Sequence, residues 1–374
     1  MSKKSLALVV SALMVLASCG GTTDATTTTE GGASDTTAAP PTTAGSVTTT
    51  APEAEFPEEP VEVIYYVGGV TSSAPQDWAA VAQGFFEEVN IEIEFVVLDG
   101  TSQAVQAVAA DGSGFAFTQG SILDEMLIVD ANTGAPPLIG IAAGAMFNPV
   151  AMIFLEGNGI STPADLVGKT IGVPQGSLSA TYLDVFLAAE GISQDDVEVL
   201  NIGFAALNPA LLTGQVDAIV AFARAIASVD LAAQEQDDTV GSFMFADFDI
   251  PSPLTGVVVQ QSLVDEHPEV ARAIAVASTR GLHFCAVNAE QCIQDFVDLN
   301  EGRDFALTLA EWEVALEVQY GIDPSAAEGA DPLTLGWWDP DLIAGTIPDL
   351  RETFGIATEF DPATLYTNDF VTQP

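Results

Sequence analysis

The chain has 374 residues, with 53 acidic residues against only eight Lys and Arg, and a formal net charge of −45 at pH 7. Nucleic acid and anionic lipid surfaces are excluded as partners for so negative a protein, and we read the charge as serving solubility. His267 and His283 are the only histidines, and no pair of cysteines has CxxC spacing. The sequence therefore predicts no zinc site and no other metal centre.

The first 18 residues have the pattern of an export signal. Lys3 and Lys4 precede an apolar run at residues 6–17, and no acidic residue occurs before Cys19. An apolar run of about a dozen residues is shorter than the roughly 20 that span a bilayer. We therefore predict a signal peptide at residues 1–18 that is removed after export.

The end of this signal, Leu16-Ala17-Ser18-Cys19, resembles the bacterial lipobox, in which the cysteine thiol receives diacylglycerol. The resemblance implies lipidation at Cys19, which would anchor the protein at the outer face of the cytoplasmic membrane or in the periplasm. The alternative is an ordinary secretory signal in which Cys19 has no role.

Residues 19–60 are rich in Thr, Ala, Gly, Ser and Pro and include Thr26-Thr27-Thr28-Thr29. A segment of this composition cannot bury a core, so we predict a disordered tether. A chain of about 40 such residues has a reach of roughly a few tens of Å, enough to hold a globular part above a membrane.

Strands and helices are expected to alternate from residue 61 onward. The chain order is strand 61–66, helix 78–88, strand 91–97, helix 103–110, and strand 114–117 leading into a turn at 118–121. The strands are rich in β-branched and aromatic residues, and apolar residues recur at helical spacing in the helices. This alternation predicts an α/β fold whose sheet is mostly parallel, with ligands at the carboxyl ends of its strands.

The same pattern restarts after Asn148. We expect strands at 150–155, 170–173, 197–202 and 218–222, and helices at 179–190 and 207–212. Beyond Pro253 the pattern is helical, at 268–282, 289–299 and 309–318. Two successive α/β units predict two lobes, the first at residues 61–148 and the second at 149–252, with residues 253–374 returning to the first.

Cys285 and Cys292 are the two remaining cysteines, seven residues apart. In an oxidising exterior they are able to form a disulfide across a short turn. Two buried free thiols fit the sequence equally well.

Four motifs occur in an order that is known from one protein family. They are Gly84-Phe85-Phe86, a stretch at 99–109 (DGTSQAVQAVA), a stretch at 161–174 (STPADLVGKTIGVP) and a stretch at 211–218 (LLTGQVDA). Together they resemble the binding proteins that serve importers of aliphatic sulfonates, nitrate-like anions and thiamine pyrimidines. The resemblance covers about residues 61–299. It implies the two-lobed periplasmic-binding-protein fold of type II, with a ligand cleft between lobes that close around the solute.

The family's binding loops correspond to turns at strand ends in this chain. The resemblance implies ligand contacts at Tyr66, Gly68, Gly69, Gln119, Gly120, Ser121, Gln175, Gly176 and Ser177. Two further candidates, Phe222 and Arg224, come from the residues themselves, because the family often has an acid at this point of the chain. Helix N-termini at these turns could hold a carboxylate or sulfonate through backbone N–H groups. The alternative is ordinary turn chemistry, with Gly for positive φ and Ser for capping. Arg224 fits an anionic ligand, or a surface ion pair.

We therefore expect an exported solute-binding protein, a monomer without a cofactor, that delivers a sulfonate-like anion or small heterocycle to an ABC importer permease and its ATPase. Aromatic residues that could stack on a ring, or form the core, are Tyr65, Tyr66, Phe115, Phe117, Tyr182 and Phe222. Two alternatives are an enzyme like the related pyrimidine synthases, which would need Lys169 for pyridoxal phosphate, and an adhesion or scaffold lipoprotein. We expect no enzymatic activity.

Overall fold

The computed structural model describes residues 56–69, 75–131, 134–174 and 176–374. The predicted signal peptide, Cys19, most of the predicted tether and Gln175 lie outside these ranges. Within them, no helix is both long enough and apolar enough to cross a membrane.

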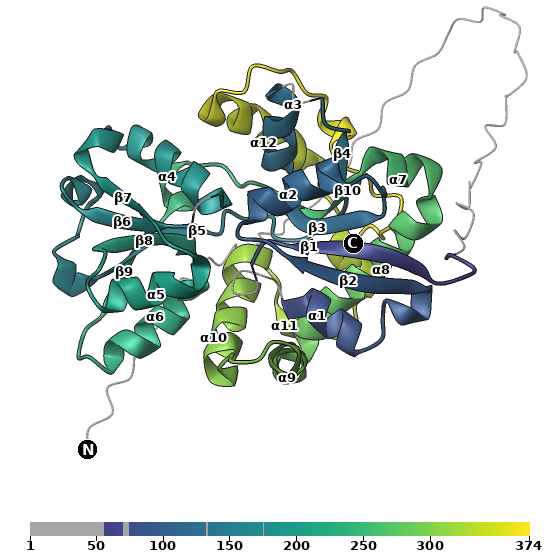
Figure 1. Ribbon diagram of the computed structural model, residues 1–374, viewed down its shortest axis with the longest axis horizontal. Coiled ribbons are helices and arrows are strands. Elements are labelled where there is room, and N and C mark those ends of the chain that lie inside the picture. Colours follow the sequence, from purple (N-terminus) through teal and green to yellow (C-terminus); the bar gives the residue numbers. More distant parts are fainter. Residues whose placement is uncertain (1–55, 70–74, 132–133, 175) are drawn as a thin grey trace, which may run out of the picture. The chain divides into compact units, whose positions relative to one another are not determined.

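Lobe 1 is built on a five-stranded sheet in the order β2-β1-β3-β10-β4 (Figure 1). Its strands are β1 (Val61–Val67), β2 (Ile91–Val97), β3 (Ala116–Ser121), β4 (Leu138–Ala143) and β10 (Thr255–Gln260). Helix α2 (Thr101–Ala110) covers one face, and α1 (Pro75–Ala82) and α8 (Pro268–Val287) lie on the other. Tyr65 stacks on Phe117 in the core of this lobe, with ring centroids 4.6 Å apart.

Lobe 2 is built on a second five-stranded sheet in the order β7-β6-β8-β5-β9. Its strands are β5 (Val150–Leu155), β6 (Thr170–Val173), β7 (Glu198–Asn201), β8 (Ala218–Phe222) and β9 (Val240–Met244). Helix α4 (Leu178–Ala189) covers one face, and α5 (Phe204–Leu212) and α6 (Ala225–Gln234) cover the other (Figure 1). Every residue of β5 is buried, which explains its uninterrupted apolar sequence.

Each sheet is mixed, and the expectation of a mostly parallel sheet is correct for strand direction, because in each sheet four strands run one way and a single strand, β10 or β5, runs against them. β1 runs parallel to β2 and β3, but β10 runs antiparallel to β3 and β4. In lobe 2, β5 likewise runs antiparallel to β8 and β9. Both β5 and β10 follow a crossing between the lobes. They do not follow a crossover helix on the same sheet, so the connection that makes neighbours parallel is missing.

The turn expected at residues 118–121 is part of strand β3. Backbone pairing with β10 continues as far as Ser121 opposite Thr255, so these polar residues belong to the sheet. Helix α3 (Ile122–Asp130) starts immediately afterwards, and the N–H of Asp124 donates to the Ser121 side chain at 3.0 Å. The helix expected at 78–88 also ends earlier, at Ala82, before Gly84 takes a left-handed conformation with φ of +75°.

The C-terminal part is helical. It contains α7 (Gln261–Glu266), α9 (Ala289–Leu299), α10 (Phe305–Ala315), α11 (Pro324–Ala327) and α12 (Pro340–Phe354). Helix α10 packs against α6 of lobe 2 and against α9. It continues into a short π-helical segment at Leu316–Tyr320, a type of segment that is frequent at functional sites.

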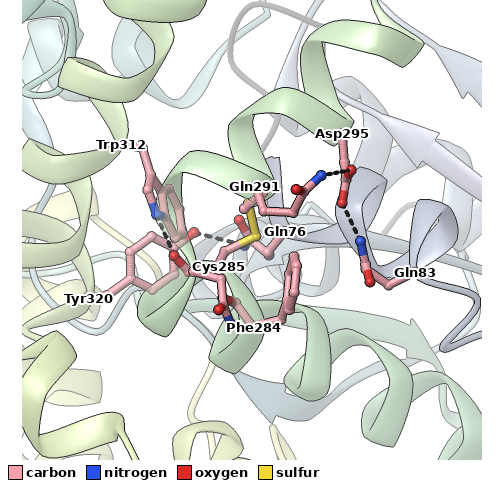
Figure 2. The surroundings of a disulfide bond; sticks show 10 residues. Gln76, Gln83, Phe284, Cys285, Gln291, Asp295, Trp312 and Tyr320 are labelled. Atoms are coloured by element: carbon pink, nitrogen blue, oxygen red, sulfur yellow. Dashed lines mark hydrogen bonds between the residues drawn. A yellow bond between two sulfur atoms is a disulfide. The ribbon is translucent and has the colours of Figure 1, made fainter.

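A disulfide joins Cys285 near the end of α8 to Cys292 in α9, with the two Cα atoms 5.0 Å apart (Figure 2). This separation lies within the usual range for disulfides. The indole N–H of Trp312 donates to the Cys285 carbonyl at 2.9 Å, and the Trp312 ring packs against Tyr320. The α8–α9 junction thus supports the segment that carries Tyr320.

Candidate ligand-binding site

A cavity of about 60 Å³ lies between the two lobes and the segment that follows α10. Its lining includes Tyr65, Gly68, Thr101, Thr118, Gln119, Gly120, Ser121 and Asp124 from lobe 1, Leu178, Phe222 and Arg224 from lobe 2, and Gln319 and Tyr320 after α10. The cavity therefore collects side chains from three parts of the sequence that only the tertiary fold brings together.

Six of the residues expected to bind ligand line this cavity: Gly68, Gln119, Gly120, Ser121, Phe222 and Arg224. Tyr66, Gly69, Gly176 and Ser177 are not among the lining residues. Alternation along β1 places Tyr65 and Tyr66 on opposite faces of the sheet, and the Tyr66 hydroxyl donates to Asp111 at 3.0 Å. The hydroxyl of Ser177 caps helix α4 by accepting from the N–H of Ala180.

The two lobes touch beside the cavity. The N–H of Leu178 in lobe 2 donates to the Thr101 hydroxyl of lobe 1 at 3.3 Å. A Cβ atom added to Gly100 would lie 2.2 Å from the carbonyl oxygen of Gly176, so backbone meets backbone here. This close approach describes a closed arrangement of the lobes.

A buried carboxylate organises the lobe 1 wall. Asp77, in the first turn of α1, is completely buried and accepts a hydrogen bond from the Tyr65 hydroxyl at 3.0 Å. The side-chain amide nitrogen of Gln119 donates to both oxygens of Asp77, at 2.9 and 3.2 Å. Burial raises the pKa of Asp77 to about 6, although the hydrogen bonds from Gln119 and Tyr65 act to lower it.

A second carboxylate, that of Asp124, lines the cavity at the start of α3. The Ser121 hydroxyl donates to it at 2.6 Å, and burial raises its pKa. Sequence reasoning missed Asp77 and Asp124. The spacing of Ser121 and Asp124 matches a helix-capping pattern. This pattern is the sequence signal that could identify Asp124.

The opposite wall carries a positive charge. Arg224 lies over the ring of Phe222, 5.1 Å from its centroid, and donates to the side-chain oxygen of Gln319 at 3.5 Å, a long hydrogen bond. Burial lowers the pKa of Arg224. The Tyr320 hydroxyl accepts from Gln76 at 2.9 Å (Figure 2). Burial raises the pKa of Tyr320 to about 12. Gln319 and Tyr320 were also missed from sequence.

Lys169 lies away from the residues that line the cavity. Its ammonium group donates to the Asn158 carbonyl at 2.7 Å and pairs with Asp217 at 3.9 Å. Across the ranges that the structure describes, no group of three or more His, Cys, Asp and Glu side chains is arranged to hold a metal ion.

The sequence matches the NMT1/THI5-like family over residues 76–292, which is more than half of the chain. One relative is the riboflavin-binding protein RibY of Chloroflexus aurantiacus, 24% identical over 309 residues, covering 79% of this chain and 81% of that protein. Another is a putative thiamine biosynthesis protein of Haemophilus influenzae, 29% identical over 159 residues. That match covers 42% of this chain and 48%, about half, of the relative.

Among solved structures, the periplasmic aliphatic sulphonate binding protein SsuA of Escherichia coli superposes with a TM-score of 0.58. The superposition covers 82% of this chain and 97% of that one, at 13% identity. At this identity the likeness shows the fold alone, and it confirms the expected two-lobed periplasmic-binding-protein architecture. With this fold and the extent of the family match, the chain belongs to the NMT1/THI5-like family.

Proposed function

We propose that the protein is the extracytoplasmic solute-binding component of an ABC importer and delivers a small organic solute to a membrane permease. The observation that carries this proposal is the cavity lined by polar side chains of both lobes. A solute that fills it would contact lobe 1 and lobe 2 at once and would stabilise the closed arrangement over an open one.

The groups that line the cavity are suited to binding a solute. The side-chain nitrogen of Gln319 is buried and has no hydrogen-bond partner among the described residues. A buried donor without a partner costs about 1–3 kcal/mol, which a solute with a suitable acceptor would recover. Lys169, which a pyridoxal phosphate enzyme would need, does not line the cavity. We therefore propose capture of a solute without turnover.

Arg224 makes a sulfonate-like anion, or another solute with strong acceptors, the favoured ligand class. The relatives are named for riboflavin, an aliphatic sulphonate and thiamine biosynthesis, so family membership alone leaves several classes open.

The test is isothermal titration of the mature protein with a panel of alkanesulfonates, amino acids and riboflavin. We expect one class to bind, and Arg224→Gln to weaken that binding at least tenfold, about 1.4 kcal/mol. The matched control is Arg280→Gln, because Arg280 pairs with Glu88 at 2.7 Å on the surface of lobe 1. Equal affinity in the two variants would contradict the assignment of the cavity as the binding site.

We further propose that lipid on Cys19 holds the protein at the membrane, within reach of the permease. Cys19→Ala should then move the protein from the membrane fraction to the soluble fraction. Retention of the variant in the membrane fraction would contradict the anchor without affecting the binding assignment.

A further inference from the structure

A groove of about 290 Å³ lies between lobe 2 and the junction of α9 and α10, and it is larger than the cavity of about 60 Å³. Its lining comes from α5, from the end of β8 and the start of α6, and from residues 302–311. Phe222 and Arg224 line both the groove and the cavity, and every other lining residue belongs to one of them alone. Capture of a solute in the cavity gives this groove no role.

The groove gathers positive charge in a very acidic chain. Arg224 and Arg303 are two of only eight Lys and Arg residues, against 53 acidic residues. Burial lowers the pKa of both arginines, and Glu311, which also lines the groove, acts to raise it. Glu311 is therefore close enough to attract both guanidinium groups.

The polar groups of the groove suit a singly charged carboxylate. A guanidinium has five N–H donors, so it can keep its protein partners and still bind an anion, and its planar shape matches a carboxylate. The negative charge of Glu311 beside the arginines disfavours a doubly charged anion such as a phosphate monoester. Asp304, the other acid of the lining, is exposed and caps α10 by accepting from the N–H of Leu307 at 2.9 Å.

The remaining walls of the groove are largely apolar. Phe204, Leu207 and Pro209 of α5 form one part of the lining. The ring of Phe222 forms another, with its centroid 5.1 Å from the guanidinium carbon of Arg224. Sites for small molecules typically combine apolar and aromatic walls with a few polar groups that fix the ligand. The groove thus presents apolar surface beside its charged groups.

We propose that this groove is a second ligand site, for a singly charged carboxylate with a compact apolar body. The carboxylate would pair with Arg303 and Arg224, and the apolar body would lie against Phe204 and Leu207. This site is additional to the proposed capture of a solute in the cavity, so either assignment can fail without the other.

The probe is 4-fluorobenzoate, because fluorine NMR follows its binding at any site. We expect it to bind the wild-type protein, and Arg303→Gln to weaken that binding at least tenfold. Arg303 lies over the ring of Phe296, 5.6 Å from its centroid, and the matched control is Arg280→Gln, since Arg280 lies over the ring of Phe85 at 4.3 Å. This control should bind the probe as the wild type does. The absence of binding at about 10 mM probe, or an equal loss in the two variants, would overturn the proposal.

Gln319→Met shows which of the two spaces the probe occupies. Gln319 lines the cavity and not the groove, so this variant should bind 4-fluorobenzoate within about twofold of the wild type. A loss at least as large as that of Arg303→Gln would place the probe in the cavity and overturn the second site.

A steric variant guards against misfolding of Arg303→Gln. Ala205 is exposed in the first turn of α5 and lines the groove, so Ala205→Trp should obstruct it and leave both arginines in place. The control is Ala206→Trp, since Ala206 is also exposed but does not line the groove. The probe should bind Ala205→Trp at least tenfold more weakly than Ala206→Trp. Equal affinity of these two variants would contradict the proposed location.

Competition tests the ligand class. Benzoate should displace 4-fluorobenzoate, whereas acetate, which lacks the apolar body, and benzyl alcohol, which lacks the charge, should need at least tenfold higher concentrations. Displacement by either of them as readily as by benzoate would overturn the class of ligand proposed for the groove.

Discussion

At the scale of single residues, Asp77 is the group on which the cavity wall depends most. It is buried and yet ionised at neutral pH, because the hydrogen bonds from Gln119 and Tyr65 offset part of the cost of burying its charge. That cost remains visible in the raised pKa.

The pKa of Asp77 predicts a pH dependence of folding stability. Its value is about 6 in the folded protein against an ordinary 3.8 for an aspartate carboxyl, so between these values the folded state binds more protons than the unfolded state. Stability from this group is therefore present below about pH 4 and is lost as pH rises to about 6. The unfolding free energy lost across this pH range is roughly 3 kcal/mol.

Urea unfolding between pH 4 and 7 checks this prediction by comparing the wild type with Asp77→Asn. As pH rises across this window, the unfolding free energy of the wild type should fall relative to that of Asp77→Asn. A difference that is constant with pH would contradict the raised pKa.

At the scale of elements, local patterns predict those strands and helices whose own sequence determines them. The strands expected at 91–97, 150–155 and 218–222 coincide with β2, β5 and β8. Strand β10 was missed because it forms only by pairing with β3 and β4, more than 100 residues earlier in the chain. The polar end of β3 has the sequence of a turn, and only its pairing with β10 makes it a strand.

The residues of the candidate site likewise fall into those that the local sequence marks and those that it does not. Gly68, Gln119 to Ser121, Phe222 and Arg224 lie at strand ends. The family resemblance points to the first two of these positions, and the rarity of cations and an aromatic ring point to Arg224 and Phe222. Gln319 and Tyr320 come from the π-helical end of α10, and no local signal marks that segment as part of a cavity. Asp77 resembles any acid in the first turn of a helix until its contacts with Tyr65 and Gln119 are known.

At the scale of the whole molecule, the central claim is that closure of two lobes holds the solute. Gly100 and Gly176 lie where the lobes meet, and Gly100 has φ of −156°, an extended conformation that any residue adopts. Alanine at position 100 should therefore leave each lobe folded but prevent their contact, because its Cβ would lie 2.2 Å from the Gly176 carbonyl oxygen.

Gly203 provides a matched control. Like Gly100 it occupies a helix N-cap with negative φ, but a Cβ added there would meet no atom within 4 Å. Gly203→Ala should carry the same small capping and backbone effects without any effect on closure. Any difference between the two variants therefore reports on the contact between lobes.

The most direct measurement is small-angle X-ray scattering of the wild type, Gly100→Ala and Gly203→Ala, each with and without a saturating solute found by titration. The account predicts that solute reduces the radius of gyration of the wild type and of Gly203→Ala but not of Gly100→Ala. A Gly100→Ala protein that compacts with solute as the wild type does would contradict it.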